Sequence, residues 1–555
     1  MPPPGAPQKR PNIVLILVDD MGYSDIGCFG SEIETPNLDG LAARGIAFTQ
    51  AYNCARCCPT RASLLTGLYP HQAGVGAMVS NLGSRPYQGY LRDDAVTIAE
   101  VLRASGYRTL MAGKWHVGGL YSRKDTSDWT LDDPARPMPT DRGFQEWYGT
   151  PAGAGSYFNP KPLFIGRQII EPDFDDYYYT DAISAHAARM IEGAAKGGDP
   201  FFLYVAYTAP HWPLHAPAET VAKYEGRYAD GWDPVRRARH EKLKSLSILE
   251  AKWPLSPRDE RAPDWADVPD KAWEQRRMEV YAAQIDRMDQ GVGQILAALD
   301  RLAIADDTLV LFLSDNGGCH ETIGLGHDSE WPVTLDGRPM QCGNRPDLMP
   351  GPEDTFQSYG PAWANVSNSP LRLFKHWTHE GGIATPLLAR WPARLRQGMA
   401  RLRRGDARIA PGRLDHGPVH VIDILATCVE AAGAEYPKEF GGKPIQPMEG
   451  ESLLGAFDGK ACPRRRPIFF EHEGNRAVRD GRWKLVSQYR GSWKDPTDDL
   501  GPWELYDMAE DRTETRDLAG KDKPRAEKMA AMYEDYARQT GVIRRPDLLK
   551  RDRLK

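Results

Sequence analysis

Three cysteines, Cys54, Cys57 and Cys58, stand within five residues of one another. Thiols at this density could hold a metal ion or act as a redox pair. A structural zinc site would need a second pair of ligands, and no further Cys-x-x-Cys follows at the spacing of such a site. The chemistry of this segment must therefore come from the residues that accompany the cysteines.

The segment from Cys57 to Gly67 reads Cys-Cys-Pro-Thr-Arg-Ala-Ser-Leu-Leu-Thr-Gly. This pattern, C-x-P-[ST]-R-x-x-x-L-T-G, resembles the signature of the type I sulfatases. Further blocks at 9–15, 479–485 and 504–507 look similar to those of bacterial arylsulfatases, so the resemblance covers nearly the whole chain. It implies that a formylglycine-generating maturation enzyme oxidises Cys57 to Cα-formylglycine, an aldehyde that reacts as its hydrate. The alternative is a buried, reduced cysteine before a helix.

Two acidic segments follow apolar runs: Asp19-Asp20 comes after 13–18, and Asp315-Asn316 comes after 308–313. Carboxylate and amide oxygens suit a hard cation such as Ca²⁺ or Mg²⁺. Both segments could instead be simple turns, which favour the same residue types. The resemblance implies that Asp19, Asp20, Asp315, Asn316 and the modified Cys57 hold one calcium ion, and the preference for Ca²⁺ over Mg²⁺ rests on the resemblance alone.

Five further side chains are candidates for catalysis: Arg61, Lys114, His116, His211 and Lys375. Arg61 lies about one helical turn after the first cysteine of the motif, where it can hold the modified side chain or its oxyanion. Lys114 and Lys375 would stabilise the transferring sulfate group by their charge. By resemblance, His116 is the base that triggers sulfate release and His211 the general acid for the leaving oxygen. Each could otherwise be an ordinary surface or structural residue.

Apolar strands alternating with helices are expected to position these residues. This order predicts a mostly parallel α/β sheet, in which ligands bind at the carboxyl ends of the strands, where the candidate residues stand. With the resemblance, the expected fold is a large, mostly parallel mixed sheet sandwiched by helices, as in alkaline phosphatase. The expected strands are 12–18, 107–111, 201–207, 308–313 and 385–391, and the expected helices are 35–45, 97–104, 235–249, 276–302 and 419–432.

The character of the chain changes near residues 435–465. Four short strands with turn signals between them, followed by a helix at 524–540, predict a small antiparallel sheet. We therefore expect a catalytic domain over 1–440 and a C-terminal subdomain over 441–555 that packs near the active site. Residues 317–368 are expected to form a long loop of the lid or binding type, and the basic tail 544–555 a solvated end.

Composition excludes several classes of protein. The 555 residues carry a formal net charge of −6, which gives no polycationic surface for nucleic acid. Eight cysteines are too few for a disulfide scaffold, so mostly free thiols are expected. No apolar run reaches the roughly 18 residues of a membrane span, and the N-terminal residues lack a secretory signal. The expected location is the cytoplasm, or the periplasm or exterior if a signal has been removed.

The leading hypothesis is an enzyme that hydrolyses sulfate monoesters, either aryl sulfates or sulfated carbohydrates. One alternative is a formylglycine-dependent phosphonate monoester or phosphodiester hydrolase of the same superfamily, because sulfate and phosphate esters share a tetrahedral shape. Another is a sulfatase-like binding protein without activity. Trp115, Trp212 and Trp377 flank the motif residues and could stack on an aromatic ring or a sugar, or pack in the core.

Overall fold

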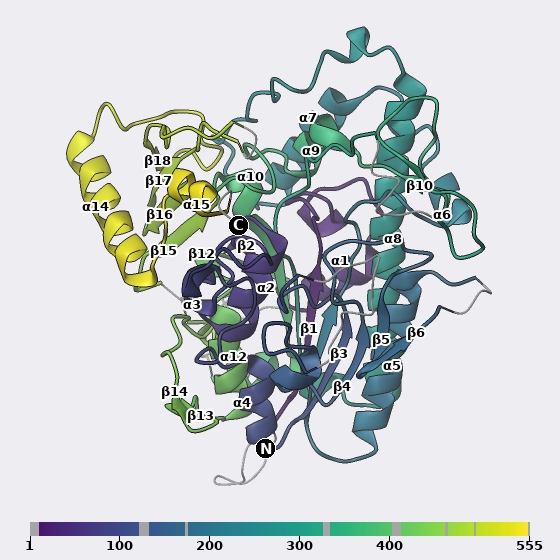
Figure 1. Cartoon of the computed structure of the whole chain (residues 1–555), viewed down its shortest axis with the longest axis vertical. Coiled ribbons are helices and arrows are strands. Elements are labelled where there is room, and N and C mark those ends of the chain that lie inside the picture. Colours follow the sequence, from purple (N-terminus) through teal and green to yellow (C-terminus); the bar gives the residue numbers. More distant parts are fainter. Residues whose placement is uncertain are drawn as a thin grey trace.

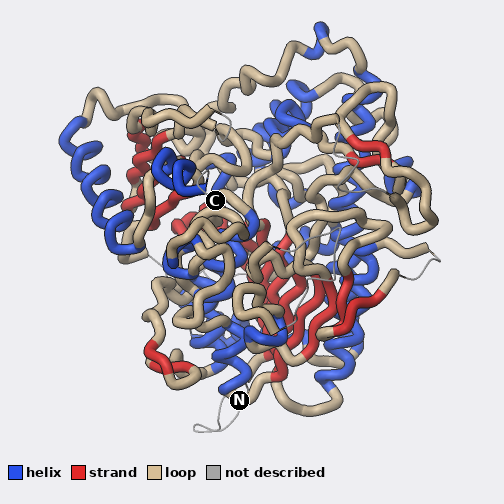
Figure 2. The backbone as a smooth tube through the Cα atoms, viewed as in Figure 1, coloured by secondary structure: helices blue, strands red, loops and turns tan. Residues whose placement is uncertain are grey.

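The computed structural model describes residues 10–120, 132–172, 176–325, 333–401, 412–460, 464–492 and 495–552. Figure 1 shows a large central sheet with helices on both sides, and a smaller sheet that lies against the long helix α14 (Lys523–Thr540). In Figure 2 the strands of the large sheet form one continuous layer between the helices. The predicted architecture, a mixed α/β sheet plus a small antiparallel sheet and a helix, is confirmed.

The large sheet has ten strands in the order β12-β2-β11-β8-β1-β7-β3-β4-β5-β6. Its centre is parallel, because β1 pairs in parallel with both β7 and β8, and β7 pairs in parallel with β3. Strand β11 runs antiparallel to both of its neighbours, which makes the sheet mixed. The strands are β1 (Asn12–Val18), β2 (Ile46–Tyr52), β3 (Arg108–Gly113), β4 (Glu146–Gly149), β5 (Leu163–Ile165), β6 (Gln168–Ile170), β7 (Phe201–Ala206), β8 (Thr308–Ser314), β11 (Ala384–Arg390) and β12 (Arg413–His420).

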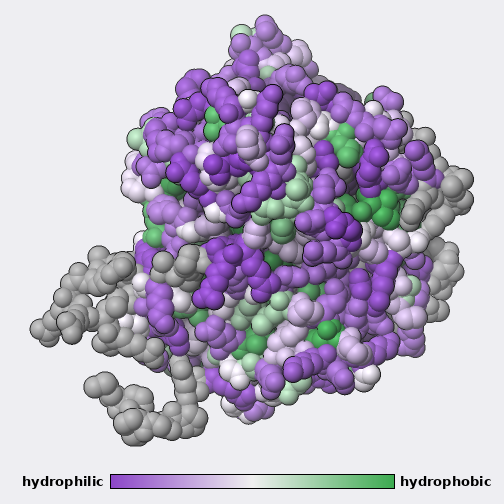
Figure 3. All heavy atoms as spheres, turned by 90° about the vertical axis from the view of Figure 1, so that its left-hand side faces the viewer, coloured by the Kyte–Doolittle hydropathy of each residue, from purple (hydrophilic) through white to green (hydrophobic). Residues whose placement is uncertain are grey.

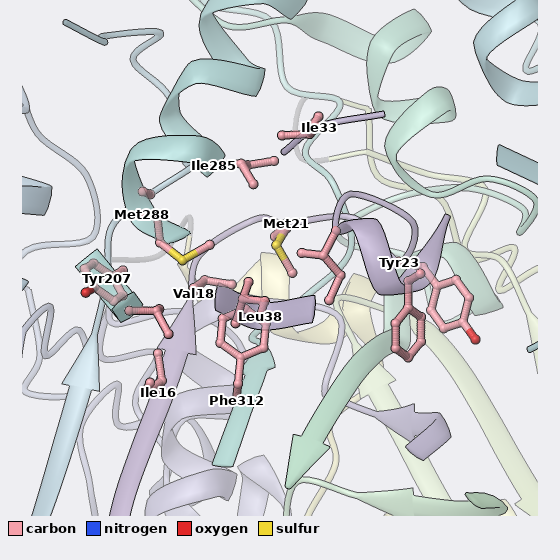
Figure 4. Close-up of a cluster of buried hydrophobic side chains, with 14 of the residues drawn as sticks. Ile16, Val18, Met21, Tyr23, Ile33, Leu38, Tyr207, Ile285, Met288 and Phe312 are labelled. Atoms are coloured by element: carbon pink, nitrogen blue, oxygen red, sulfur yellow. The ribbon is translucent and has the colours of Figure 1, made fainter. Parts of the chain in front are cut away.

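Strand β1 is apolar on both faces because both faces are covered. Its residues Val14, Ile16 and Val18 belong to one hydrophobic core, and the alternate residues Ile13, Leu15 and Leu17 belong to another. Figure 4 shows part of the first core, in which Ile16, Val18 and Phe312 of the sheet meet Met288 and Leu38 of the covering helices. Strand β1 is therefore anchored on two sides, and polar residues stand only at its ends.

The helices divide between these two cores. Helix α8, predicted as 276–302, covers the first core with its apolar stripe and begins one turn earlier than expected. The first core is covered by α1 (Pro36–Ala43), α5 (Tyr179–Ala195), α7 (Trp232–Ser245), α8 (Lys271–Arg301) and α9 (Gly360–Ser367). The second is covered by α2 (Cys57–Thr66), α3 (Pro70–Ala73), α4 (Ile98–Ala104), α11 (Pro392–Arg401), α12 (Asp423–Ala432) and α13 (Leu454–Phe457).

The small sheet has the order β15-β16-β17-β18, and every pairing in it is antiparallel. Its strands are β15 (Ile468–His472), β16 (Asn475–Asp480), β17 (Trp483–Ser487) and β18 (Glu504–Asp507). Side chains of this part reach the large domain: Lys484 Nζ donates to Glu380 Oε1 at 2.9 Å, and Arg479 donates to Gln50 Oε1 at 2.9 Å. The division into domains 1–440 and 441–555 stays a prediction.

Four local predictions were wrong. The helix expected over 419–432 starts only at Asp423, because 413–420 forms β12. The region 317–368 contains helix α9, and the helix expected over 235–249 is α7, displaced to Trp232–Ser245. The basic tail is not simply a solvated end: it forms helix α15 (Arg545–Asp552), whose Leu548 and Leu549 are buried. Residues 553–555 of that tail, together with 1–9 and Cys462, lie outside the described residues.

The remaining elements are short. Helix α10 (Glu380–Ile383) precedes β11, and α6 (Ala218–Ala222) packs on α8. The two-stranded sheets are β9 (Gln341–Cys342) with β10 (Thr355–Phe356) and β13 (Glu439–Phe440) with β14 (Lys443–Pro444). The 3₁₀ turns are Gly27–Phe29, Arg85–Tyr87, Pro139–Arg142, Trp265–Asp267 and Ala305–Asp307.

Figure 3 shows the character of one face of the molecule. The face drawn in Figure 3 is mainly hydrophilic, with hydrophobic residues in small groups. Among the described residues, no helix combines the length and the apolar character needed to cross a bilayer. Cys28, Cys54, Cys57, Cys58, Cys319 and Cys428 carry free thiols, in agreement with the expectation for most of the cysteines.

Candidate functional site

The polar residues that follow β1 and β8 lie side by side because these strands are parallel neighbours. The backbone N–H of Asp20 donates to Asp315 Oδ1 at 3.2 Å, and Asn316 Nδ2 donates to Asp20 Oδ1 at 2.6 Å. Asp19, Asp20, Asp315 and Asn316 are all at most 1% exposed. The two turns predicted at separate strand ends therefore form one buried cluster of oxygen atoms.

Cys57 is the first residue of helix α2, and every residue of that helix is buried. One turn later Arg61 points into the acidic cluster, where its Nη2 lies 2.8 Å from Asp315 Oδ2 and 3.4 Å from Asp19 Oδ2. Its Nη1 donates to the Lys114 carbonyl oxygen at 3.0 Å. Arg61 thus joins the helix that carries Cys57 to both acidic strand ends.

Two lysines complete the charge balance of the cluster. Lys114, which follows β3, donates to Asp19, and Lys375 donates to Asp20 Oδ2 at 2.8 Å. Three carboxylates therefore face three cations, Arg61 included, with all six groups buried. Buried charges are stable only when they are paired and hydrogen-bonded, so each of these six groups depends on its partners to stay charged.

His211 lies at the edge of this cluster, after β7. Its Nε2 is 3.3 Å from both Lys375 Nζ and Asp20 Oδ2. Its Nδ1 is 2.6 Å from the Trp212 carbonyl oxygen, which can only accept, so Nδ1 carries a hydrogen and Nε2 faces the site. Burial lowers the pKa of His211, although the charge of Asp20 opposes the shift.

His116 lies on the other side, next to the thiols. Cys57, Cys58 and His116 place their ligand atoms within 4.8 Å of one another. A hydrogen bond with Cys58, aided by the charge of Lys114 and by a hydrogen bond with His116, holds the pKa of the Cys57 thiol well below its usual range. Burial lowers the pKa of His116 to about 4, so its imidazole is neutral at neutral pH.

The backbone around the site is strained at several residues. Asp20, Ala55, His116 and His376 have φ values of 65°, 62°, 55° and 94°, in the left-handed region that non-glycine residues rarely adopt. Each such residue costs on the order of 1–3 kcal/mol and persists only where its surroundings fix it. These four residues lie in four separate segments that meet at the site. The strained geometry of the site therefore lowers the stability of the fold.

The oxygen cluster fits a bound cation. Asp19 Oδ1 and Asn316 Oδ1 are buried and make no hydrogen bond within the described part of the chain. Burial, followed by the negative charge of Asp315, raises the pKa of Asp19 to about 7. A hard cation would satisfy both oxygens and relieve the repulsion between the carboxylates.

Two functional candidates were missed from the sequence. Arg56, directly before Cys57, pairs with Glu321 Oε1 at 2.7 Å, and Lys375 Nζ is 3.6 Å from Glu321 Oε2. Trp212 Nε1 donates to Glu321 Oε2 at 2.9 Å. Arg56 and Glu321 are partly exposed, so they lie between the buried cluster and the surface. The only available signal was position: Glu321 follows Asp315 by six residues on the same strand-end loop.

The three tryptophans take different places. Trp115 is fully buried in the second core, with its Nε1 donating to the Pro137 carbonyl oxygen at 2.8 Å. Trp212 and Trp377 are half-buried at the margin of the first core. Core packing therefore accounts for Trp115, and Trp212 and Trp377 remain able to meet a ligand.

Comparison with known proteins identifies the family. The family model described as Sulfatase matches residues 11–434. An uncharacterised sulfatase of Schizosaccharomyces pombe is 30% identical over 98% of this chain and 96% of its own length. The chain belongs to the sulfatase family.

Two further proteins are similar to this sulfatase over most of its length. An arylsulfatase of Klebsiella aerogenes is 34% identical over 83% of this chain and 95% of its own. The crystal structure of Ps i-CgsB in complex with k-i-k-neocarrahexaose superposes with a TM-score of 0.64, at 26% identity, over 97% of this chain and 94% of that one. The protein is a sulfuric ester hydrolase with the alkaline-phosphatase-like fold that the sequence predicted.

Gly317, next to Asn316, gives a first test of the site's packing. A Cβ atom there would lie 1.8 Å from the Gly381 carbonyl oxygen, so Gly317→Ala must displace the strand-end loop. We expect a loss of about 1–3 kcal/mol in the free energy of unfolding and a fall in sulfatase activity. Urea denaturation and kcat/KM measure the two effects. Gly193→Ala is the control, since a Cβ there meets no atom within 4 Å; equal stability of the two variants would contradict the prediction.

Proposed function

We propose that this sulfatase hydrolyses sulfate monoesters, aryl sulfates or sulfated carbohydrates, to an alcohol or phenol and inorganic sulfate, with Cys57 converted to Cα-formylglycine. The observation that carries the proposal is the meeting of Cys57, three carboxylates, Arg61 and two lysines at one sheet edge. Conversion requires a formylglycine-generating maturation enzyme as a partner.

One calcium ion completes the proposed site. Asp19, Asp20, Asp315, Asn316 and the modified residue 57 would hold it, and the unpaired oxygens of Asp19 and Asn316 support this assignment. When bound, the ion and the aldehyde hydrate supply an activated hydroxyl nucleophile and a positive charge for the sulfate oxygens. Oxygen ligands alone do not separate Ca²⁺ from Mg²⁺.

The chain's own side chains would perform the remaining steps. Lys114 pairs with Asp19 and Lys375 with Asp20, and both would hold the sulfate group by their charge. Arg61 orients residue 57 through the helix they share. His116, next to residue 57, would accept a proton from it during sulfate release, and the charged form of His211 would donate the Nε2 proton to the leaving oxygen.

Mass spectrometry of the tryptic peptide that contains residue 57 tests the proposal, with protein from a host that has the maturation enzyme. The expected mass loss is that of thiol-to-aldehyde conversion. Rates on a matched aryl sulfate and aryl phosphonate separate the proposed activity from phosphonate hydrolysis. A phosphonate preference of several orders of magnitude would reverse the assignment, and full activity with an unmodified Cys57 would exclude the mechanism.

His211→Asn tests the role of the general acid. We expect kcat/KM on an alkyl sulfate to fall by about 10²–10⁴-fold, because an alkoxide needs a proton to leave. The loss should be much smaller on 4-nitrophenyl sulfate, whose phenolate leaves without protonation. Steady-state rates on a series of leaving groups measure the difference. His186→Asn is the control, since that ring stacks on Tyr148 away from the site; an equal loss on all substrates would argue against proton donation.

A further inference from the structure

A second group of metal-ligand side chains lies outside the carboxylate cluster. His376, His472 and Glu473 place one ligand atom each within 4.8 Å of one another. His376 comes from the loop before α10, whereas His472 is the last residue of β15 and Glu473 begins the turn between β15 and β16 of the small sheet. The proposed mechanism uses none of these three side chains, so catalysis does not explain why they lie together.

The buried ring of His472 has no hydrogen-bond partner within the described residues. Its side chain is fully buried, and neither Nδ1 nor Nε2 has a partner within the described residues. An imidazole always has one N–H donor and one acceptor, or two donors, and a buried unsatisfied polar group costs about 1–3 kcal/mol.

His376 and Glu473 are already positioned to bind the same ion. His376 Nδ1 is 3.4 Å from Glu473 Oε2, a separation compatible with two ligands of one ion. The second oxygen of Glu473, Oε1, pairs with Arg545 of α15 at 2.9 Å. A metal-bound carboxylate commonly has such an outer partner, which fixes its orientation and leaves one oxygen for the ion. The strained φ values of His376 and Glu473, 94° and 51°, show that this geometry is imposed by the fold.

We propose that His376, His472 and Glu473 form a second metal site that takes a transition metal ion of the Zn²⁺ type. Two imidazole nitrogens and one carboxylate oxygen are ligands that Zn²⁺ prefers, whereas Ca²⁺ prefers oxygen ligands alone. Arg56 is a nearby cation, but Glu321 pairs with it at 2.7 Å.

The site would join parts of the chain that surround the active site. The His376 N–H donates to the Ala55 carbonyl oxygen at 2.7 Å, two residues before Cys57. Asn475 Nδ2 donates to the His376 carbonyl oxygen at 3.3 Å. Figure 1 shows α15, which carries Arg545, between the small sheet and α10. A bound ion would thus fix the small sheet and the C-terminal helix to the segment that carries Cys57.

Metal titration of the full chain tests the proposed second site. The titration uses the Cys57→Ala variant, which lacks the cluster formed by Cys57, Cys58 and His116. After removal of metal with a chelator, we expect one Zn²⁺ per chain, measured by competition with a chromophoric chelator. Co²⁺ at the same stoichiometry should give the visible absorption of a low-coordinate site, and Zn²⁺ should raise the melting temperature. Because the measured quantity is metal binding and not turnover, the result is independent of the proposed sulfatase mechanism.

Variants assign the ligands. His472→Gln should abolish Zn²⁺ binding, Glu473→Gln should weaken it, and Arg545→Gln should weaken it by about 10–100-fold, as expected for an outer partner. His186→Gln, outside the site, should bind like the parent. The proposal is overturned if the parent takes up no Zn²⁺ or Co²⁺, or if His472→Gln and Glu473→Gln bind as the parent does. Glu473 is partly exposed, so its variant should fold even if the His472 variant does not.

Discussion

Replacing Cys57 with alanine is expected to lower kcat for sulfate ester hydrolysis by on the order of 10⁶-fold, the effect seen when an enzyme loses its nucleophile. The expectation follows from the position of Cys57 at the start of α2, beside Arg61, Lys114 and His116. Hydrolysis of 4-nitrophenyl sulfate measures the loss, and the melting temperature should change little, because one sulfur atom is removed.

Cys58→Ser is the matched control for this experiment. Cys58 is equally buried and adjacent in sequence. Its thiol lies 3.5 Å from the Met78 sulfur and hydrogen-bonds with the Cys57 thiol, and a serine hydroxyl can keep the second contact. We expect this variant to keep activity within about tenfold of the parent, the scale of a small packing change. Similar activities of Cys57→Ala and Cys58→Ser would show that residue 57 is not the nucleophile.

Asp315→Asn is expected to damage both stability and activity. The Asp315 carboxylate pairs with Arg61, and both side chains are fully buried. Breaking a buried pair leaves an uncompensated charge and costs about 3–5 kcal/mol. Activity should fall on the order of 10³-fold or more, because the same carboxylate is a proposed ligand of the cation that stabilises the sulfate charge. Denaturant unfolding and kcat measure the two losses.

Lys484→Met is the control that separates the loss of stability from the loss of activity. Lys484 pairs with Glu380 and Glu514 at 2.9 and 2.7 Å, with all three side chains fully buried, but it belongs to the small sheet and contacts no proposed ligand. Its loss should destabilise the protein by a similar amount and leave kcat nearly unchanged at a temperature where the variant is folded. If Asp315→Asn lost no more activity than Lys484→Met, the catalytic assignment of Asp315 would fail.

The centre of the fold could be predicted because its strands are apolar on both faces. Strands β1, β7 and β8 appear in the sequence as short apolar runs, and each is followed by polar residues. Strand β2 escaped prediction because Thr49 and Gln50 interrupt its apolar character. Strand β12 escaped for a related reason: Arg413 and His416 lie within it, and its pairing with β2 is decided by contacts distant in sequence.

The C-terminal helix shows a second limit. Residues 544–555 contain many charges, which favours a solvated end, yet α15 buries Leu548 against Leu82 and Tyr87. Two leucines give too weak a periodic signal to predict a packed helix. The same reasoning explains Glu321 and His472: nothing in their neighbourhoods marks them, because their partners Arg56 and His376 lie far away along the chain.

The burial of α2 sets an order of events in biosynthesis. Cys57 is 2% exposed, and the whole helix from Cys57 to Thr66 lies under the sheet and its neighbouring helices. A maturation enzyme must surround its target residue, which it cannot do once this helix is packed. Under the proposed function, conversion of Cys57 therefore competes with folding, and a chain that folds first stays an inactive thiol protein. The yield of active enzyme would then depend on the supply of maturation enzyme during synthesis.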